Sequence, residues 1–141
     1  MSVHDRFKDA MTNSLAVAER GKHVEALQLL DEAIAQAIRE HDVLWIRTLC
    51  HHAAIESRLA ENWASAKRYY EQSLASDPEN ARALYGVAAV ALDEGDAVTA
   101  RQYATRCRTS LLQTRPGDLK TWPSRFDCEE LARPCVEVIS S

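Results

Sequence analysis

Glycine and proline are scarce in this sequence of 141 residues, which contains four of each. Both residues interrupt helices, whereas alanine, leucine, glutamate and arginine, in which the chain is rich, lose little conformational freedom in a helix. Little β signal competes with this preference. The composition therefore predicts an all-α protein, and the length is enough to bury one continuous hydrophobic core.

Long hydrophobic runs are also missing, because no apolar stretch approaches the roughly eighteen residues of a membrane span. The first ten residues, MSVHDRFKDA, place charges where a signal peptide would need an apolar segment. We therefore expect no membrane partner and a cytoplasmic protein.

Cysteine is sparse, and its four positions show no Cys-x-x-Cys spacing. The residues fall where a small side chain suits helix packing. The sequence therefore predicts free thiols in a reducing compartment for Cys50, Cys107, Cys128 and Cys135.

Positive charge is in deficit, since 17 Lys and Arg against 21 Asp and Glu give a formal net charge of −4. Nucleic-acid binding needs a clustered basic face, so nucleic acid is disfavoured as a partner. One local exception exists in residues 101–126, where Asp118 is the only acidic residue. We interpret this basic strip as a solvated helix face, with nucleic-acid binding as the lesser alternative. The strip consists of Arg101, Arg106, Arg108, Arg115, Lys120 and Arg125.

What the sequence does have is an internal repeat. Residues 66–88, AKRYYEQSLASDPENARALYGVA, read as a helix of period 3.6, a stop at Asp77-Pro78 and a second helix. Proline cannot continue a helix, and it pushes the preceding residue out of the α region. Small residues recur where two helices must touch: Ala66 follows Ala26 by 40 residues and precedes Ala100 by 34. The repeat is therefore real but uneven, and its first unit is longer.

The periodicity and the turn residues together predict six helices. Gly, Pro, Asp or Asn stands at most of the breaks between them, as expected for turns. The predicted helices cover residues 3–19, 22–40, 43–60, 63–76, 80–93 and 96–114.

These features resemble the tetratricopeptide repeat family over about residues 6–114, in the alternation of small and large residues and in the Asp-Pro corner. The resemblance implies an α-solenoid of about three antiparallel helix pairs, wound as a right-handed superhelix. The repeats would cover residues 7–46, 47–80 and 81–114, within a domain of residues 1–114. The long first repeat is similar to variants found in bacterial regulators and scaffold proteins.

Residues 115–141 have a different character, with Pro116, Pro123 and Pro134 close together. We expect an irregular C-terminal tail with one short helix near residues 127–132. It either caps the last repeat helix or docks on a neighbouring copy to form a homodimer.

In this family the first helix of each repeat lines a concave surface. The resemblance implies that the corresponding helices of this chain form a partner-binding groove. Its mixture of apolar, His and Arg side chains suits an extended or helical peptide with apolar anchors. The alternative is that Leu15, Ile55 and Leu92 are buried by the tail or by packing between units. The expected groove residues are Met11, Leu15, Thr48, His51, His52, Ile55, Arg58, Leu59, Arg82, Tyr85, Ala89 and Leu92.

One binding mode of the family is excluded by the residues present. Family members that grip the C-terminal carboxylate of heat-shock chaperones use Lys, Asn and Arg at defined repeat positions. Only an arginine could serve here, because those positions hold Met11, Leu15, His52, Arg82 and Gly86.

Motifs for catalysis are absent: there is no phosphate-binding Gly-rich loop and no Gly-x-Ser-x-Gly elbow. Cys50 is next to His51, but its repeat position faces a partner helix, so we expect a buried and inert thiol. His52 and Glu56 share a helical face, yet two ligands do not make a zinc site. We therefore expect no enzyme, no metal or other cofactor and no small-molecule substrate.

The sequence thus predicts a protein–protein interaction module, an adaptor or chaperone that binds a peptide or protein segment in the groove. The alternative is a self-associating regulatory or scaffold subunit whose main interface is homo-oligomeric.

Overall fold

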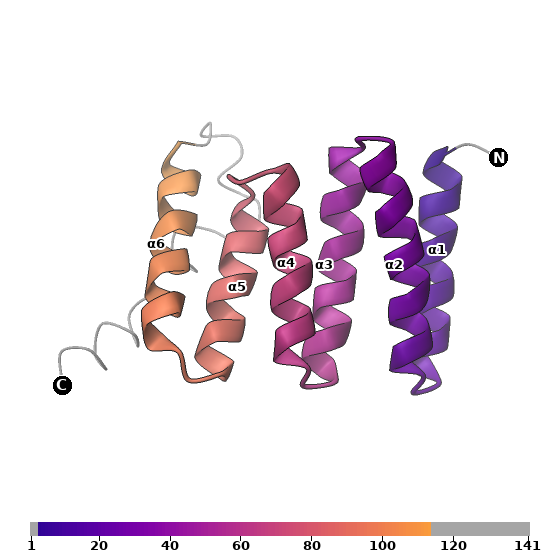
Figure 1. Cartoon of the computed structure of the whole chain (residues 1–141), viewed down its shortest axis with the longest axis horizontal. Coiled ribbons are helices and arrows are strands. Elements are labelled where there is room, and N and C mark those ends of the chain that lie inside the picture. Colours follow the sequence, from indigo (N-terminus) through magenta and orange to yellow (C-terminus); the bar gives the residue numbers. More distant parts are fainter. Residues whose placement is uncertain (1–2, 114–141) are drawn as a thin grey trace. The chain divides into compact units, whose positions relative to one another are not determined.

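The computed structural model describes residues 3–113, and all of the regular structure in this range is α-helical (Figure 1). Every helix begins and ends within two residues of its predicted boundary. The prediction of an all-α protein is therefore confirmed. The helices are α1 (Val3–Glu19), α2 (His23–Arg39), α3 (Val43–Leu59), α4 (Trp63–Ser76), α5 (Ala81–Asp93) and α6 (Ala97–Leu112). None of these six is long and apolar enough to cross a membrane.

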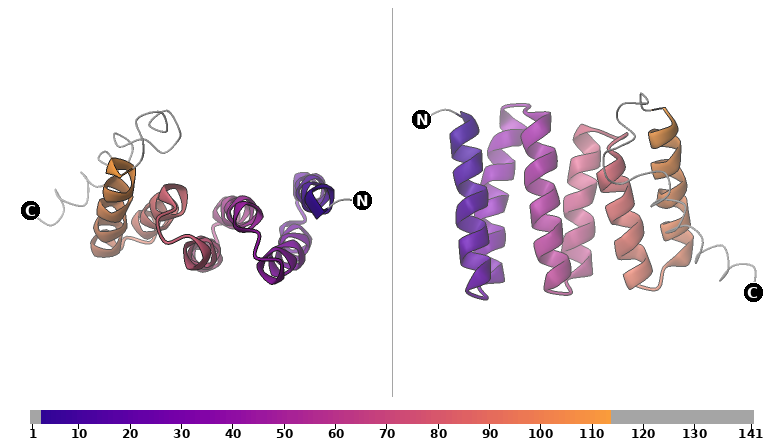
Figure 2. Two further views of the ribbon diagram at one scale, coloured as in Figure 1. Left: turned by 90° about the horizontal axis from the view of Figure 1, so that it is seen from above. Right: turned by 180° about the vertical axis from the view of Figure 1, so that it is seen from behind.

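The helices pack as consecutive pairs, as the repeat predicts. The chain forms two compact units, residues 1–77 and 78–141. In the first unit α1 packs on α2 and α3 on α4, while α2 also packs on α3 and joins the two pairs. Seen from above, α1 and α3 form one layer of this unit and α2 and α4 the other (Figure 2). In the second unit α5 packs on α6. The short helix predicted near residues 127–132 lies outside the described residues.

The same tight turn recurs at four of the five helix connections. One residue takes a left-handed conformation, with φ of +79° at Gly21, +53° at His41, +57° at Glu61 and +82° at Gly95. In each turn the next backbone N–H bonds to a carbonyl five residues back, as Asn62 N does to Ser57 O at 2.8 Å. This pattern closes the end of the preceding helix. Glycine fits that conformation without strain, whereas His41 and Glu61 adopt it with a side chain.

A short polar side chain caps the N-terminus of four helices. The side chains of Asp42, Asn62, Asn80 and Asp96 each accept a hydrogen bond from a free backbone N–H of the first turn, at 3.1–3.2 Å. Such caps satisfy donors that have no partner within the helix. The polar residues at the breaks therefore set where α3, α4, α5 and α6 begin.

The core of the first unit combines large side chains with alanines at the helix contacts. Phe7 of α1 packs against Trp45 of α3, with ring centroids 5.5 Å apart. Leu30 of α2, Leu49 of α3 and Tyr69 of α4 are large core side chains and are at most 2% exposed. The fully buried alanines, which let the backbones approach, are Ala26, Ala37, Ala53, Ala54 and Ala66.

The core of the second unit joins α5 to one side of α6. Leu84 and Val87 of α5 are buried, as are Ala104 and Leu111 of α6. Burial extends around much of α5, and the fully buried residues there include Val90 and Ala91.

Cys107 corrects one prediction. It is buried in this core as expected, but it is disulfide-bonded. Its sulfur lies 3.4 Å from the carbonyl oxygen of Ala81. A disulfide sulfur has no proton, so this contact is not a hydrogen bond. The prediction of four free thiols is wrong at this position, because spacing along the helix identifies a packing site but not the bond the sulfur makes. The inference of a reducing compartment loses that support.

Candidate functional site

The two sides of α3 differ sharply in exposure. The side that faces α2 and α4 buries Ile46, Leu49, Cys50, Ala53 and Ala54 at no more than 3% exposure. The opposite side carries an exposed row in which Leu44 is 62%, Ile55 38% and Leu59 71% exposed. These residues recur at helical spacing with Thr48, so they lie along one stripe of the helix.

The α1 helix adds a second, smaller set of apolar side chains. It contacts α3 directly and lies in the same layer (Figure 2). Leu15 is 47% exposed, and Met11 is half-buried one helical turn earlier. We call these exposed and half-buried residues of α1 and α3 the α1–α3 face. It consists of Met11, Leu15, Leu44, Thr48, His51, His52, Ile55, Arg58 and Leu59.

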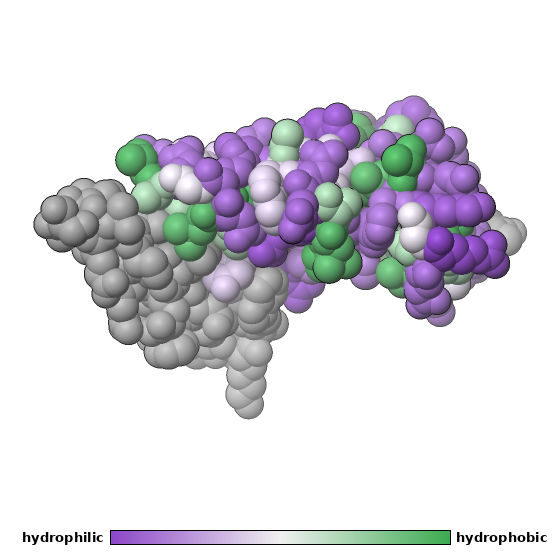
Figure 3. Space-filling view, turned by 90° about the horizontal axis from the view of Figure 1, so that it is seen from below, coloured by the Kyte–Doolittle hydropathy of each residue, from purple (hydrophilic) through white to green (hydrophobic). Residues whose placement is uncertain are grey.

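On the face seen in Figure 3, hydrophobic residues gather in patches rather than in one continuous sheet. Figure 3 views the molecule from the end that carries the α1–α2 and α3–α4 turns, and separate green patches stand within a hydrophilic surface. Leu59, next to the α3–α4 turn, is the most exposed apolar residue of the α1–α3 face. The patches therefore offer isolated apolar anchor points with polar surroundings.

The histidines of the α1–α3 face are partly desolvated. His51 and His52 are half-buried, with ring centroids 6.2 Å apart in an edge-on arrangement. Burial lowers the pKa of His52 below its ordinary value, so the neutral ring is favoured. The face is consequently less basic than its two histidines suggest.

The remaining polar members of the face have partners within the first unit. The Thr48 hydroxyl donates to the Leu44 carbonyl of its own helix at 2.9 Å. Arg58 interacts with the hydroxyl of Tyr70, whose pKa is raised by burial and lowered in part by this guanidinium. Arg58 therefore supports the packing of α4 on α3.

A buried carboxylate is the main feature that the sequence interpretation did not anticipate. Glu56 is only 8% exposed, and its Oε1 contacts Nδ1 of His23 at the start of α2. The sequence placed Glu56 beside His52 on one helical face. In the structure Glu56 instead contacts His23, which links α3 to α2. Among the described residues, no three His, Cys, Asp or Glu side chains are placed to hold a metal. The available signal was spacing, since Glu56 follows Leu49 by seven residues and Ala53 by three, on the side of the helix that carries the core.

Cys50 lies behind the face and is chemically quiet. It is completely buried, as predicted. Burial raises the pKa of its thiol to about 12, and the negative charge of Asp31 adds to the effect. The thiolate, which is the reactive form, is therefore strongly disfavoured.

The groove residues predicted on α5 belong to the second unit and have different environments. Arg82 is exposed, while Tyr85 and Leu92 are half-buried. Ala89 is buried at 9% exposure, and Gly86 beside it is also buried. The α5 set thus offers fewer accessible atoms than the α1–α3 face.

Comparison with known proteins supports the repeat assignment. Residues 59–109, which run from the end of α3 into α6, match the sequence profile of the family described as Tetratricopeptide repeat. None of the curated protein sequences compared with the chain matches it.

Several solved structures share the fold. The first TPR of Spaghetti (RPAP3), bound to the HSP90 peptide SRMEEVD, is 12% identical with a TM-score of 0.70, over 97% of this chain and 95% of that chain. The Yersinia enterocolitica type III secretion chaperone SycD, in complex with a peptide of the translocator YopD, is 10% identical with a TM-score of 0.72, over 97% and 96%. PcrH in complex with the chaperone binding region of PopD is 15% identical with a TM-score of 0.60, over 99% and 92%.

Consecutive helix pairs, the matched profile and these shared structures agree with one another. Identities this low establish the fold alone, whereas the profile identifies the repeat in the sequence itself. Residues 59–109 therefore carry a tetratricopeptide repeat, and the chain has the fold of tetratricopeptide repeat proteins.

Proposed function

We propose that the chain is an adaptor or chaperone that binds a peptide or protein segment on the α1–α3 face of its first unit. The observation that carries the proposal is the exposed row of Leu44, Ile55 and Leu59 beside Leu15 of α1. Fully burying one such side chain contributes about 1.5–3 kcal/mol, so a partner that covers the row would stabilise the complex by removing these side chains from water.

The solved structures support this reading by analogy. Three proteins of the same fold are bound to peptides or binding regions of partner proteins, from HSP90, YopD and PopD. A repeat fold of this kind presents a preformed surface, so its partner meets helices that are already ordered.

The residues of the face favour a partner with apolar anchors. The carboxylate-gripping positions of the family hold Met11, Leu15 and His52 in this unit, and the neutral form of His52 is favoured. Arg58 is engaged with Tyr70. Recognition would therefore depend on covering the exposed leucine and isoleucine side chains of the face and on backbone contacts rather than on charge.

A matched pair of isoleucine substitutions tests the proposal. Peptides selected from a random library on the wild-type protein would be titrated by fluorescence anisotropy against Ile55→Asp and Ile38→Asp. Both residues are about equally exposed, at 38% and 42%, but Ile38 lies on α2 in the other layer. We expect at least tenfold weaker binding for Ile55→Asp and little change for Ile38→Asp. Equal effects of the two substitutions would contradict the proposal.

Self-association is the competing function, and the same variant separates it. The SycD fold has been solved as a dimer, described as an alternative dimer, at 11% identity and a TM-score of 0.73. If a second copy covers the α1–α3 face, light scattering would show a wild-type dimer that Ile55→Asp converts to a monomer. A peptide-binding monomer in both proteins would favour the adaptor reading.

The residues Arg82, Tyr85, Ala89 and Leu92 remain proposed contacts in the second unit. Tyr85→Ala tests them separately, because their contribution does not follow from that of α3. Loss of peptide affinity in this variant, with an unchanged circular dichroism spectrum, would add α5 to the binding surface.

A further inference from the structure

The outer side of α6 has a charge pattern that the proposed function does not use. Its sixteen residues include three arginines and no acidic residue. All three, Arg101, Arg106 and Arg108, are exposed. Within residues 3–113, no carboxylate lies within ion-pair distance of them. Among the described residues, the guanidinium groups on this side of α6 therefore have no compensating carboxylate.

Two of the arginines belong to a regular stripe. Val98, Arg101, Thr105, Arg108 and Leu112 recur at intervals of three and four residues, opposite the buried side of the helix. Its two ends are apolar and open to solvent, since Val98 is 58% and Leu112 53% exposed. We call these five residues the α6 stripe. It is about 21 Å long at a rise of about 1.5 Å per residue, and its two arginines are about 10 Å apart.

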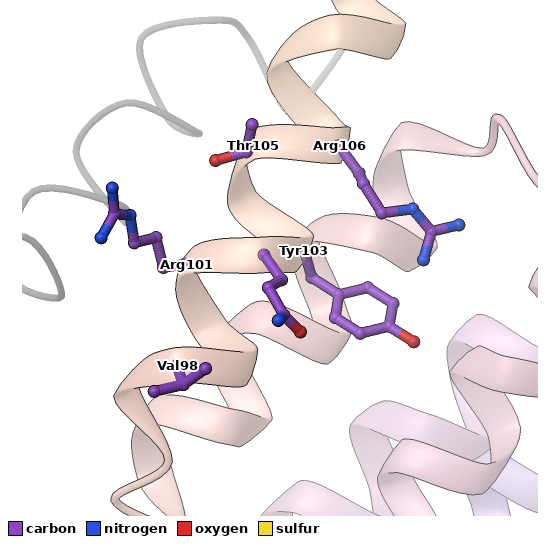
Figure 4. A pocket seen from close by; sticks show the side chains of 6 residues that line it. Val98, Arg101, Tyr103, Thr105 and Arg106 are labelled. Carbon is purple, nitrogen blue, oxygen red and sulfur yellow. The ribbon is translucent and has the colours of Figure 1, made fainter.

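A pocket of about 700 Å³ adjoins this stripe (Figure 4). Val98, Arg101 and Thr105 border it on one side of the helix, while Arg106 and Tyr103 project to the other side. The guanidinium of Arg106 stacks over the Tyr103 ring, 4.9 Å from its centroid. Stacking holds the arginine in place and leaves its edge free to donate two hydrogen bonds to a carboxylate.

We propose that the α6 stripe is a second docking surface, for an acidic amphipathic helix of a partner protein. A helix is the element whose side chains repeat at the same spacing, so it can lie along the stripe. Two carboxylates seven residues apart would meet Arg101 and Arg108, and apolar residues beyond them would cover Val98 and Leu112. A further acidic side chain would reach Arg106.

Charge complementarity favours an acidic protein segment over nucleic acid. The whole chain carries a formal net charge of −4, which repels a long phosphate polymer. A short acidic helix meets chiefly the local field of the three arginines, because salt screens more distant charges within about 10 Å. The α6 stripe belongs to the second unit and shares no residue with the α1–α3 face, so either proposal can fail without the other.

The test uses the full chain and a fluorescein-labelled synthetic helical peptide, with two glutamates seven residues apart and leucines flanking them. Its affinity would be measured by anisotropy at low and moderate salt, beside a scrambled peptide and a single-stranded oligonucleotide of similar length. The key variant is Arg101→Gln with Arg108→Gln. The matched control, Arg20→Gln with Arg39→Gln, removes the same charge from exposed positions of the first unit.

We expect the designed peptide to bind wild type more tightly than the scrambled peptide or the oligonucleotide. The Arg101 and Arg108 double variant should lose at least tenfold in affinity, the control less than twofold, and Ile55→Asp nothing. Equal losses in both arginine pairs, no binding to wild type at low salt, or tighter binding of the oligonucleotide would each overturn the proposal. Unchanged circular dichroism and thermal midpoints would show that the variants are folded.

Discussion

The left-handed turn residue Glu61 offers the most direct test of how the repeat geometry is encoded. It has φ of +57° between α3 and α4, in the place that Gly21 takes between α1 and α2. The backbone hydrogen bonds are equivalent, since Asn62 N reaches Ser57 O at 2.8 Å and Lys22 N reaches Val17 O at 3.3 Å. The perturbation is Glu61→Gly, which leaves this turn otherwise unchanged.

The expected gain follows from two opposing effects. A residue with a Cβ costs about 1–2 kcal/mol in the left-handed region, and glycine removes that cost. Glycine also gives the unfolded chain more freedom, which destabilises the fold by about 0.4–1 kcal/mol. The Glu61 side chain is exposed and makes no hydrogen bond or ion pair with another described residue, so nothing further is lost. The net effect is a stabilisation of about 0.8 kcal/mol, or about 3 °C in Tm.

The assay is urea and thermal unfolding followed by circular dichroism, with Gly21→Ala as the opposite control. No atom lies within 4 Å of a Cβ built on Gly21, so that substitution changes backbone preference alone. We expect it to lower stability by about as much as Glu61→Gly raises it. A Glu61→Gly protein that is no more stable than wild type, while Gly21→Ala is destabilised, would refute the reasoning for Glu61.

Three further predictions concern polar groups of the first unit. Burial lowers the pKa of His52 in the folded protein, so wild-type stability should fall as the pH drops below about 6.5 and through the folded pKa. His52→Gln should flatten this part of the profile of urea midpoint against pH. His23→Ala should lower the free energy of unfolding in urea by about 1 kcal/mol, because it leaves the carboxylate of Glu56 without its described partner. In a double-mutant cycle, adding Glu56→Gln should restore part of that free energy. Burial and the hydrogen bond to Asp31 at 2.6 Å raise the pKa of Tyr69 to about 12, so wild type should lose stability between about pH 10 and 12, which Tyr69→Phe should not.

The helices could be predicted because their determinants are local. Capping residues such as Asn62 and Asp96 stand directly before the helices they start, and Gly21 and Gly95 stand at left-handed turns. The turn at Glu61 was also expected, but its left-handed conformation could not be, because glutamate seldom adopts it. Helix periodicity likewise identifies the small residues at helix contacts.

Side-chain pairings between helices could not be predicted in the same way. Glu56 and His23 are 33 residues apart, and their contact depends on how α2 packs on α3. The disulfide at Cys107 depends on distances that a spacing pattern does not contain. Burial of Ala89 is similar: its repeat position implies the groove side of α5, yet its surroundings exclude solvent.

The two sides of α3 differ strongly in exposure, so substitutions on its exposed side can test binding without altering the core. Core residues such as Leu49 and Ala53 are fully buried and hold α3 against its neighbours, so their substitution would alter folding and binding together. Leu59 is 71% exposed, and replacing it removes little packing from the folded protein. A loss of partner affinity in Leu59→Asp at unchanged stability therefore reports on the surface itself. The same contrast explains how repeats with nearly identical turns can differ in function. The turns and the buried alanines determine how the helices pack, whereas the exposed residues can vary without disturbing that packing.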